Sequence, residues 1–153
     1  MNKLSIAITS LCVLLFGVVA AWNADTAGVR ANIQTGTQRK PAAALHLADA
    51  SGKTVALSQY RGKIVLLNFW ATECGGCKLE IPWFMELDQA YKSKGLDVIG
   101  VSMDVVYENL KDAKEGWSRV LPFVREHKLN YSILMADDSV AKAYNIEAMP
   151  API

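Results

Sequence analysis

The stretch Lys63–Pro82, which reads KIVLLNFWATECGGCKLEIP, contains a strand, a turn and the start of a helix. Its segment Ile64–Phe69 is apolar except for Asn68, as is typical of a strand that is covered on both faces. Two polar residues then interrupt the run, and a helix is expected to begin at Cys74 and Cys77. A Cys-x-x-Cys pair at the N-terminus of a helix that follows such a strand indicates a redox site.

The composition supports one folded domain and a short targeting segment in a chain of 153 residues. Hydrophobic residues make up 52% of the chain and charged residues 20%, which is enough apolar material for a core and argues against disorder. The formal net charge is +1, so the sequence offers no electrostatic basis for a nucleic-acid partner.

Residues 1–22 have the features of an export signal. One positive charge is followed by the uncharged segment 4–22, and Val19–Ala21 is a candidate cleavage site. The alternative is an uncleaved membrane anchor, which the length of the apolar run slightly favours because about 20 residues span a bilayer. We therefore expect the domain to lie outside the cytoplasm, in the periplasm or an equivalent compartment, anchored to the inner membrane by residues 4–22.

The remaining chain divides into a linker and a domain. Residues 23–41 are polar and rich in small side chains, which is typical of a linker. Residues 42–153 alternate strand and helix patterns, which predicts an α/β domain with parallel strands. After the first hairpin at 44–57, which has Gly52 in its turn, strands are expected at 64–69, 96–102 and 130–135, and helices at 74–94, 117–127 and 139–144.

The three cysteines have different expected roles. Cys12 lies in the apolar leader, where it is most simply a small hydrophobic residue. Cys74 and Cys77 are then the only cysteines of the expected exported domain. One vicinal pair in an exported protein favours catalysis over a structural framework, which needs more bridges.

Three further residues of the cysteine helix carry structural expectations. Pro82 lacks a backbone donor and is expected to kink the helix. Trp83 and Met85 have the spacing of core residues, with a partner-binding surface as the alternative. The two histidines, His46 and His127, are expected to be structural because neither has a second histidine nearby.

Four motifs, in this order, resemble the TlpA/ResA group of exported thiol–disulfide oxidoreductases in the thioredoxin superfamily, related to the AhpC/TSA and Redoxin families. The resemblance covers Leu45–Pro150 and implies a thioredoxin-like fold with an N-terminal hairpin and three α/β/α layers. The motifs are LSQYRGK at 57–63, LNFWATECGGCKLEIP at 67–82, VIGVSMD at 98–104 and YNIEAMP at 144–150.

The position of the two cysteines predicts a different role in the reaction for each of them. Cys74 at the helix N-terminus is expected to be the exposed nucleophile, because free backbone N–H groups and the helix dipole stabilise a thiolate there. Cys77, one turn further, is expected to be the buried resolving thiol. The redox-active disulfide needs no further cofactor, and no metal is expected.

The resemblance implies further site residues. Glu80 is expected to accept a proton or tune the thiol pKa values, with an ordinary solvated carboxylate as the alternative. Pro150 is implied to be a cis-proline that lies against the disulfide and shapes a substrate groove with Met149 and Trp70.

The chain also departs from the family. Glu73 stands where an aromatic residue is usual, and Gly75–Gly76 lacks the common proline before the second cysteine. The chain ends at Ile153, where the family continues with a hairpin and a final helix. We therefore expect an incomplete domain in which one edge of the Ile64–Phe69 strand is uncovered, and Pro152 is an unfavourable residue for a following strand.

These residues predict a reductase of disulfides in partner proteins. The carboxylates of Glu73 and Glu80 repel a thiolate, and strong oxidants depend on a stabilised thiolate. The resemblance implies that apocytochrome c is a partner, together with a membrane thiol reductant that supplies electrons. The alternatives are a peroxiredoxin-like antioxidant enzyme and a non-catalytic metal-binding module or inactive fragment.

Overall fold

The structure is a computed structural model that describes residues 40–153. The leader, residues 1–22, and nearly all of the linker, residues 23–41, therefore lie outside the described residues. The described elements are β1 (His46–Ala48), β2 (Thr54–Ala56), η1 (Leu57–Tyr60), β3 (Ile64–Trp70), α2 (Gly75–Tyr91), η2 (Lys92–Lys94), β4 (Leu96–Ser102), α3 (Asp104–Tyr107), α4 (Ala113–Glu126), β5 (Ser132–Met135), α5 (Asp138–Ala143) and β6 (Ala151–Pro152). Between residues 40 and 153, no helix has the length and apolar character needed to cross a bilayer.

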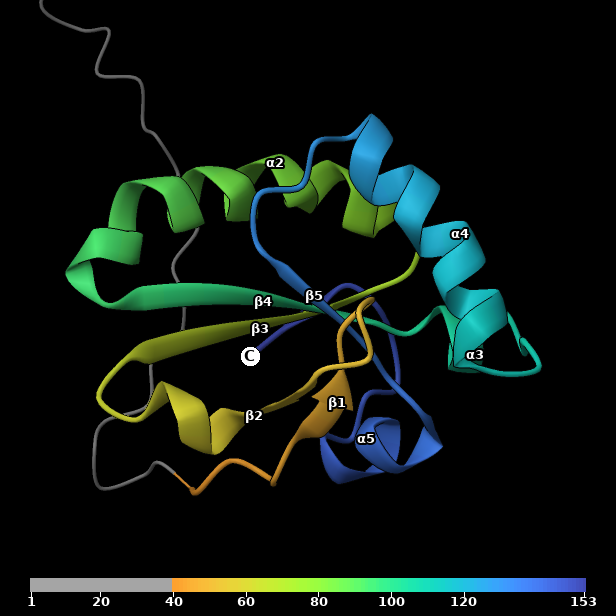
Figure 1. Ribbon diagram of the computed structural model, residues 1–153, viewed down its shortest axis with the longest axis horizontal. Coiled ribbons are helices and arrows are strands. Elements are labelled where there is room, and N and C mark those ends of the chain that lie inside the picture. Colours follow the sequence, from red (N-terminus) through yellow and green to blue (C-terminus); the bar gives the residue numbers. More distant parts are fainter. Residues whose placement is uncertain (1–39) are drawn as a thin grey trace, which may run out of the picture. The chain divides into compact units, whose positions relative to one another are not determined.

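The central sheet has the strand order β5-β4-β3-β6, and a separate antiparallel hairpin is formed by β1 and β2 (Figure 1). β3, β4 and β5 are parallel, as the helices between them require, and β6 is antiparallel to β3. β3 and β4 pair along their whole length, with Asn68 opposite Gly100. The predicted α/β fold is confirmed.

Alternate residues of the sheet face two different layers. Leu67 and Phe69 pack with the first hairpin and α5 in one core cluster. Trp70, one position further along β3, packs with residues of α2 and α4 on the opposite face. Figure 1 shows these layers, with α2 and α4 on one side of the sheet and the hairpin and α5 on the other. β3 is therefore covered on both faces over its buried half, as its apolar run predicts.

β6 covers part of the β3 edge that was expected to be uncovered. The backbones of Leu67 and Ile153 exchange two hydrogen bonds of 2.8 Å. Because bonded and non-bonded pairs alternate in an antiparallel ladder, the next pair, Asn68 and Pro152, is a non-bonded one. The missing donor of Pro152 therefore costs no bond to β3, and the expectation that Pro152 disfavours a strand here is wrong.

The cysteine helix α2 runs without interruption from Gly75 to Tyr91 and contains Pro82. Its buried face includes Cys77, as the spacing predicts. Met85 is half-buried and packs against two core clusters, but Trp83 is 61% exposed, so the expectation that Trp83 lies in the core is wrong. The buried residues of α2 follow the spacing 77, 81, 84 and 88, which leaves position 83 outside that face.

α4 begins at Ala113, four residues before the expected start at Trp117. The Asp112 carboxylate accepts a 2.9 Å hydrogen bond from the Glu115 amide, and this N-cap starts the helix ahead of the expected first residue. Asp137 caps α5 in the same way, since its carboxylate accepts hydrogen bonds from the Ser139 and Val140 amides.

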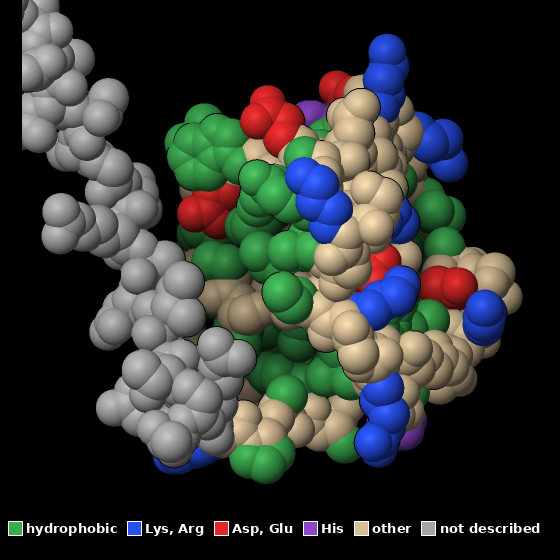
Figure 2. All heavy atoms as spheres, turned by 90° about the vertical axis from the view of Figure 1, so that its left-hand side faces the viewer, with side chains coloured by type: hydrophobic (Ala, Val, Ile, Leu, Met, Phe, Trp, Pro, Cys, Tyr) green, Lys and Arg blue, Asp and Glu red, His purple; other side chains and the backbone are tan. Residues whose placement is uncertain are grey.

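Large hydrophobic side chains also remain exposed among the described residues. Figure 2 shows hydrophobic side chains gathered between charged ones on one face of the molecule. The most exposed are Leu79 at 72%, Ile64 at 69% and Trp83 at 61%. Leu79 and Trp83 are four residues apart on α2, so they lie on the same side of that helix.

Candidate active site

The cysteine pair lies where β3 ends and α2 begins. A turn closed by a 3.2 Å hydrogen bond from the Cys74 amide to the Ala71 carbonyl connects the two elements. Cys74 is the N-cap of α2, and its Sγ accepts a 3.2 Å hydrogen bond from the Cys77 amide. The sulfur therefore occupies the place of a capping oxygen at the positive end of the helix dipole. This confirms the predicted helix N-terminus.

Cys74 and Cys77 form a disulfide, with their Cα atoms 5.3 Å apart. Cys77 is fully buried, as predicted, but Cys74 is only 6% exposed, so its expected exposure is wrong in the disulfide form. Both cysteines belong to a core cluster with Trp70 and Ile81, and Met149 packs against this cluster. Cys74 is thus the more exposed residue of the two, within a largely covered site.

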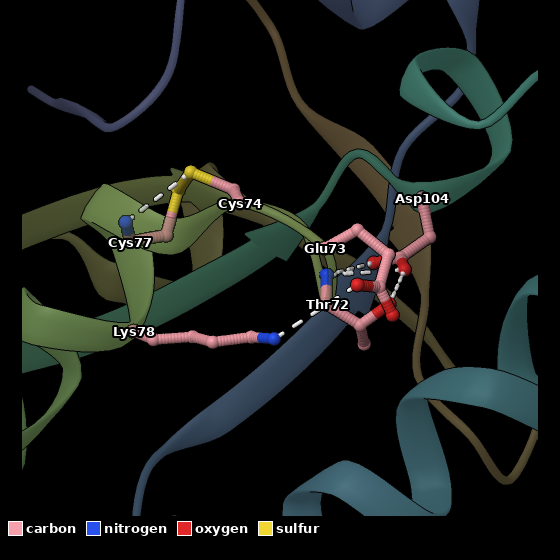
Figure 3. The surroundings of a disulfide bond; sticks show 6 residues. All are labelled: Thr72, Glu73, Cys74, Cys77, Lys78 and Asp104. Carbon is pink, nitrogen blue, oxygen red and sulfur yellow. Dashed lines mark hydrogen bonds and ion pairs between the residues drawn. A yellow bond between two sulfur atoms is a disulfide. The ribbon is translucent and has the colours of Figure 1, made fainter.

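Two carboxylates flank the pair. Glu73 is exposed, and its Oε2 lies 4.0 Å from the Nζ of Lys78 (Figure 3). This exposed contact offsets part of the Glu73 charge, which weakens the argument that Glu73 disfavours a thiolate. Glu80, one turn beyond Cys77, is half-buried, and its Oε2 has no hydrogen-bond partner among residues 40–153.

The Met149–Pro150 peptide bond is cis, as the resemblance implies. Pro150 lies against the segment between the cysteines, because a Cβ built on Gly76 would lie 3.2 Å from the Pro150 Cδ. Pro150 and the cysteine pair are therefore neighbours, although they are far apart in the sequence. Gly75, by contrast, faces open space.

Trp70 occupies a different place from the one expected. It is fully buried and packs against Phe123, with ring centroids 5.1 Å apart. Since it has no exposed surface, the expectation that Trp70 contacts a substrate is wrong for this structure. Because alternate residues of a strand face the same side of the sheet, Trp70 faces the opposite layer from Phe69. There it packs in one cluster with the two cysteines.

A buried carboxylate near the pair was missed by sequence reasoning. Asp104 follows β4 and is fully buried. It accepts hydrogen bonds from the Thr72 amide at 3.1 Å, from the Thr72 hydroxyl and from the Ser102 hydroxyl at 2.8 Å. Figure 3 shows Asp104 beside Thr72. The signal in the sequence is the Ser-x-Asp segment at the end of a buried strand, which lies at the same edge of the sheet as the end of β3.

This arrangement suits thiol chemistry. The N-terminus of α2 favours an anion on the first sulfur, and the second sulfur is close enough to form or resolve a disulfide with it. Between residues 40 and 153, no three His, Cys, Asp or Glu side chains come together as a metal site requires.

Comparisons with known proteins agree with this geometry. A family model described as the AhpC/TSA family matches residues 38–152. The thiol-disulfide oxidoreductase ResA of Geobacillus kaustophilus is 33% identical over 104 residues, which are 68% of this chain and 55% of that protein. ResA of Bacillus subtilis is 30% identical over 105 residues, covering 68% and 53% of the two chains. The chain spans about half the length of these curated relatives.

Solved structures show the same likeness. The thioredoxin domain of a thiol-disulfide oxidoreductase from Bacteroides vulgatus superposes with a TM-score of 0.62 at 27% identity, covering 79% of this chain and 80% of that one. A thiol:disulfide interchange protein from a Bacteroides species gives a TM-score of 0.59 at 28% identity, with 73% and 70% covered. From the matched residues, the fold and the cysteine pair at the start of α2, we conclude that this chain belongs to the AhpC/TSA family of thioredoxin-like proteins.

Proposed function

We propose that this chain carries the redox domain of an exported thiol–disulfide oxidoreductase that reduces disulfides in partner proteins. The observation that carries the proposal is the Cys74–Cys77 disulfide at the N-terminus of α2, with the first sulfur held at the helix cap. In the reduced form, the Cys74 thiolate attacks one sulfur of a substrate disulfide and forms a mixed disulfide. Cys77 then attacks the Cys74 sulfur, so that the substrate leaves as a dithiol and the Cys74–Cys77 disulfide forms.

Two further participants complete the proposed cycle. A membrane thiol reductant returns two electrons and two protons to the disulfide, and apocytochrome c is the proposed substrate among exported proteins. The support is the resemblance of the four sequence motifs and the export features of residues 1–22. Relatives named thiol-disulfide oxidoreductase ResA are consistent with this class of activity. The proposed location is extracytoplasmic, with residues 4–22 as the anchor.

Met149 and Pro150 are proposed to bind the substrate peptide. Met149 lines a pocket of about 230 Å³ and also packs against the cluster that contains both cysteines. The pocket is lined largely by apolar side chains, including Met103, Val106 and Ile146. An apolar residue next to the substrate disulfide would bury its side chain there while the backbone beside Pro150 pairs with the peptide.

Glu80 is proposed to exchange a proton with the Cys77 thiol. It lies one helical turn beyond Cys77, and its buried Oε2 has no partner among residues 40–153. A carboxylate in this position can accept the proton that Cys77 must lose before it attacks the mixed disulfide. An ordinary surface carboxylate would have both oxygens in water.

The central test is insulin disulfide reduction by the full chain in the presence of dithiothreitol. Cys74→Ser is expected to abolish the catalysed rate, because the attacking sulfur is gone. Cys77→Ser is expected to retain attack but to accumulate a mixed disulfide with a substrate peptide, detectable by mass spectrometry. Full activity of Cys74→Ser, or no mixed disulfide with Cys77→Ser, would contradict the proposal.

The role of Glu80 needs a matched control on the same helix. Glu80→Gln is expected to slow resolution of a mixed disulfide about tenfold or more, within the usual range for loss of a general base. Glu86→Gln removes an exposed carboxylate of the same helix and is expected to leave that rate unchanged. Equal rates in Glu80→Gln and the unmodified chain, measured by stopped-flow, would remove Glu80 from the mechanism without affecting the cysteines.

A further inference from the structure

The carboxylate of Asp104 lies beneath the turn that presents Cys74. Asp104 is 0% exposed, and its two oxygens receive hydrogen bonds from Thr72 and Ser102. Thr72 donates from both its amide and its hydroxyl, so one residue of the turn between β3 and α2 is bound to the carboxylate through two hydrogen bonds. A buried carboxylate is costly unless such donors satisfy it, which makes this contact a fixed point of the structure.

A short series of contacts connects this fixed point to the nucleophilic sulfur. Thr72 is a central residue of the turn whose ends are joined by the bond from the Cys74 amide to the Ala71 carbonyl. Two residues after Thr72, the Cys74 Sγ accepts the Cys77 amide hydrogen at 3.2 Å. The direction of the Cys74 side chain therefore depends on the turn, and the turn is anchored at Thr72. Figure 3 shows Thr72, Asp104 and the cysteine pair together.

We propose that Asp104 is a positioning residue for the redox reaction: by holding Thr72, it keeps the Cys74 sulfur at the N-terminus of α2 and against the Cys77 amide. The proposal rests on the proposed function only in taking Cys74 as the nucleophile. Asp104 acts through Thr72 and touches no reacting atom in this structure.

A purely local role for Asp104 explains fewer of the contacts. An acidic residue in the first turn of α3 would stabilise that short helix by its charge alone. The carboxylate oxygens, however, receive hydrogen bonds from Thr72, which is 32 residues away in the sequence. The Ser102 hydroxyl contributes one bond from the sheet side and does not touch the cysteine turn. Ser102 therefore provides a control that removes one donor from the same carboxylate.

The experiment measures the rate at which iodoacetamide alkylates Cys74 in the reduced full chain, as a function of pH. Thr72→Val removes the hydroxyl with little change in shape and is expected to lower the rate at pH 7 about three- to tenfold, as for the loss of one hydrogen bond. Ser102→Ala is expected to change it less than twofold, although both substitutions lower the melting temperature. Thr72→Ser keeps the hydroxyl and is expected to restore the rate.

A second pair of variants separates anchoring from charge. Asp104→Asn keeps an oxygen that can accept the Thr72 bonds, and it removes a negative charge, so its alkylation rate is expected to equal or exceed that of the unmodified chain. Asp104→Ala removes the anchor and is expected to resemble Thr72→Val. If Asp104→Ala does not fold, the comparison of Thr72→Val with Ser102→Ala still tests whether Asp104 positions Cys74 through Thr72.

The outcomes for the two proposals are distinct. Wild-type alkylation rates in folded Thr72→Val would overturn the positioning role, as would equal losses in Thr72→Val and Ser102→Ala. Alkylation needs no protein substrate, so a chain that fails to reduce insulin can still show the effect. In that case the proposed function fails while the positioning role stands.

Discussion

The two ends of β3 differ sharply in their surroundings. At the amino end, Ile64 is 69% exposed and pairs with β4 alone among the described strands. At the carboxyl end, Leu67–Trp70 are all buried, and β3 is bonded on both sides, to β4 and to β6. The end of the strand that carries the cysteine turn is therefore the more firmly held one, whereas Val65 and Leu66 are only partly buried and Ile64 is exposed.

The contacts beyond the strand strengthen this difference. The Trp70 carbonyl accepts a 2.7 Å hydrogen bond from the Met103 amide, and Asp104 then holds Thr72. The chain is thus tied to the segment after β4 at two successive places before it reaches Cys74. A thiol site needs such precise positioning, because a small displacement of the attacking sulfur strongly lowers the rate of thiol–disulfide exchange.

The largest expected effect compares the two ends of β3 directly. Phe69→Ala removes a fully buried ring at the fixed end and is expected to lower the free energy of unfolding by about 3–5 kcal/mol. Ile64→Ala at the exposed end is expected to change it by less than about 0.5 kcal/mol. Urea unfolding followed by circular dichroism measures both, and similar losses for the two would contradict the described difference.

A smaller effect concerns pH at Tyr131, the residue directly before β5. Burial raises the pKa of Tyr131 to about 12, from the ordinary value near 10. The folded state therefore holds the phenol proton more tightly than the unfolded state, so this stabilisation is present below pH ~10 and is lost as pH rises through about 12. We expect the unfolding free energy to fall by at most about 3 kcal/mol over this range.

Tyr131→Phe provides the matching test. The variant lacks the phenol, so the difference between it and the unmodified chain should change between pH 10 and 12 in urea titrations. Tyr107→Phe removes an exposed phenol, at 58% exposure, and serves as the control. A constant difference between Tyr131→Phe and the unmodified chain over this range would show that Tyr131 ionises equally in both states.

The smallest expected effect on stability compares the two glycines between the cysteines. Gly75→Ala places a Cβ in open space at the start of α2 and is expected to stabilise the chain by up to about 1 kcal/mol. Gly76→Ala places it 3.2 Å from the Pro150 Cδ, so the same gain is offset by displacement of Pro150. Thermal melts should therefore rank Gly75→Ala above Gly76→Ala, and insulin reduction should slow only in the second variant.

Much of the fold follows from local sequence patterns. β4 is found at the predicted residues, and the Asp137 cap and the hairpin turn at Gly52 are found where their residue types require. The position of the cysteines at the helix N-terminus is equally local, because it depends on the end of one apolar run. These features are set by neighbours in the sequence, which is why the sequence predicts them.

The features that were missed depend on distant parts of the chain. Trp83 has a core-like spacing, but which side of α2 meets the sheet is decided by Cys77, Ile81 and Phe84 together. Asp104 becomes part of the site only because parallel pairing brings the ends of β3 and β4 together. Cys74 likewise is buried in a cluster that includes distant residues such as Val120 and Met135, with Met149, 75 positions further along the chain, packed against it.

The orientation of Pro152 also bears on how a further strand could pair with β6. Its nitrogen faces away from β3, toward the outer side of β6. A foreign strand that added itself to that side would find no N–H donor at Pro152 and could not complete a regular ladder. The residue that fits the pairing with β3 at no cost in bonds thus also limits which strands can pair with the outer side of β6.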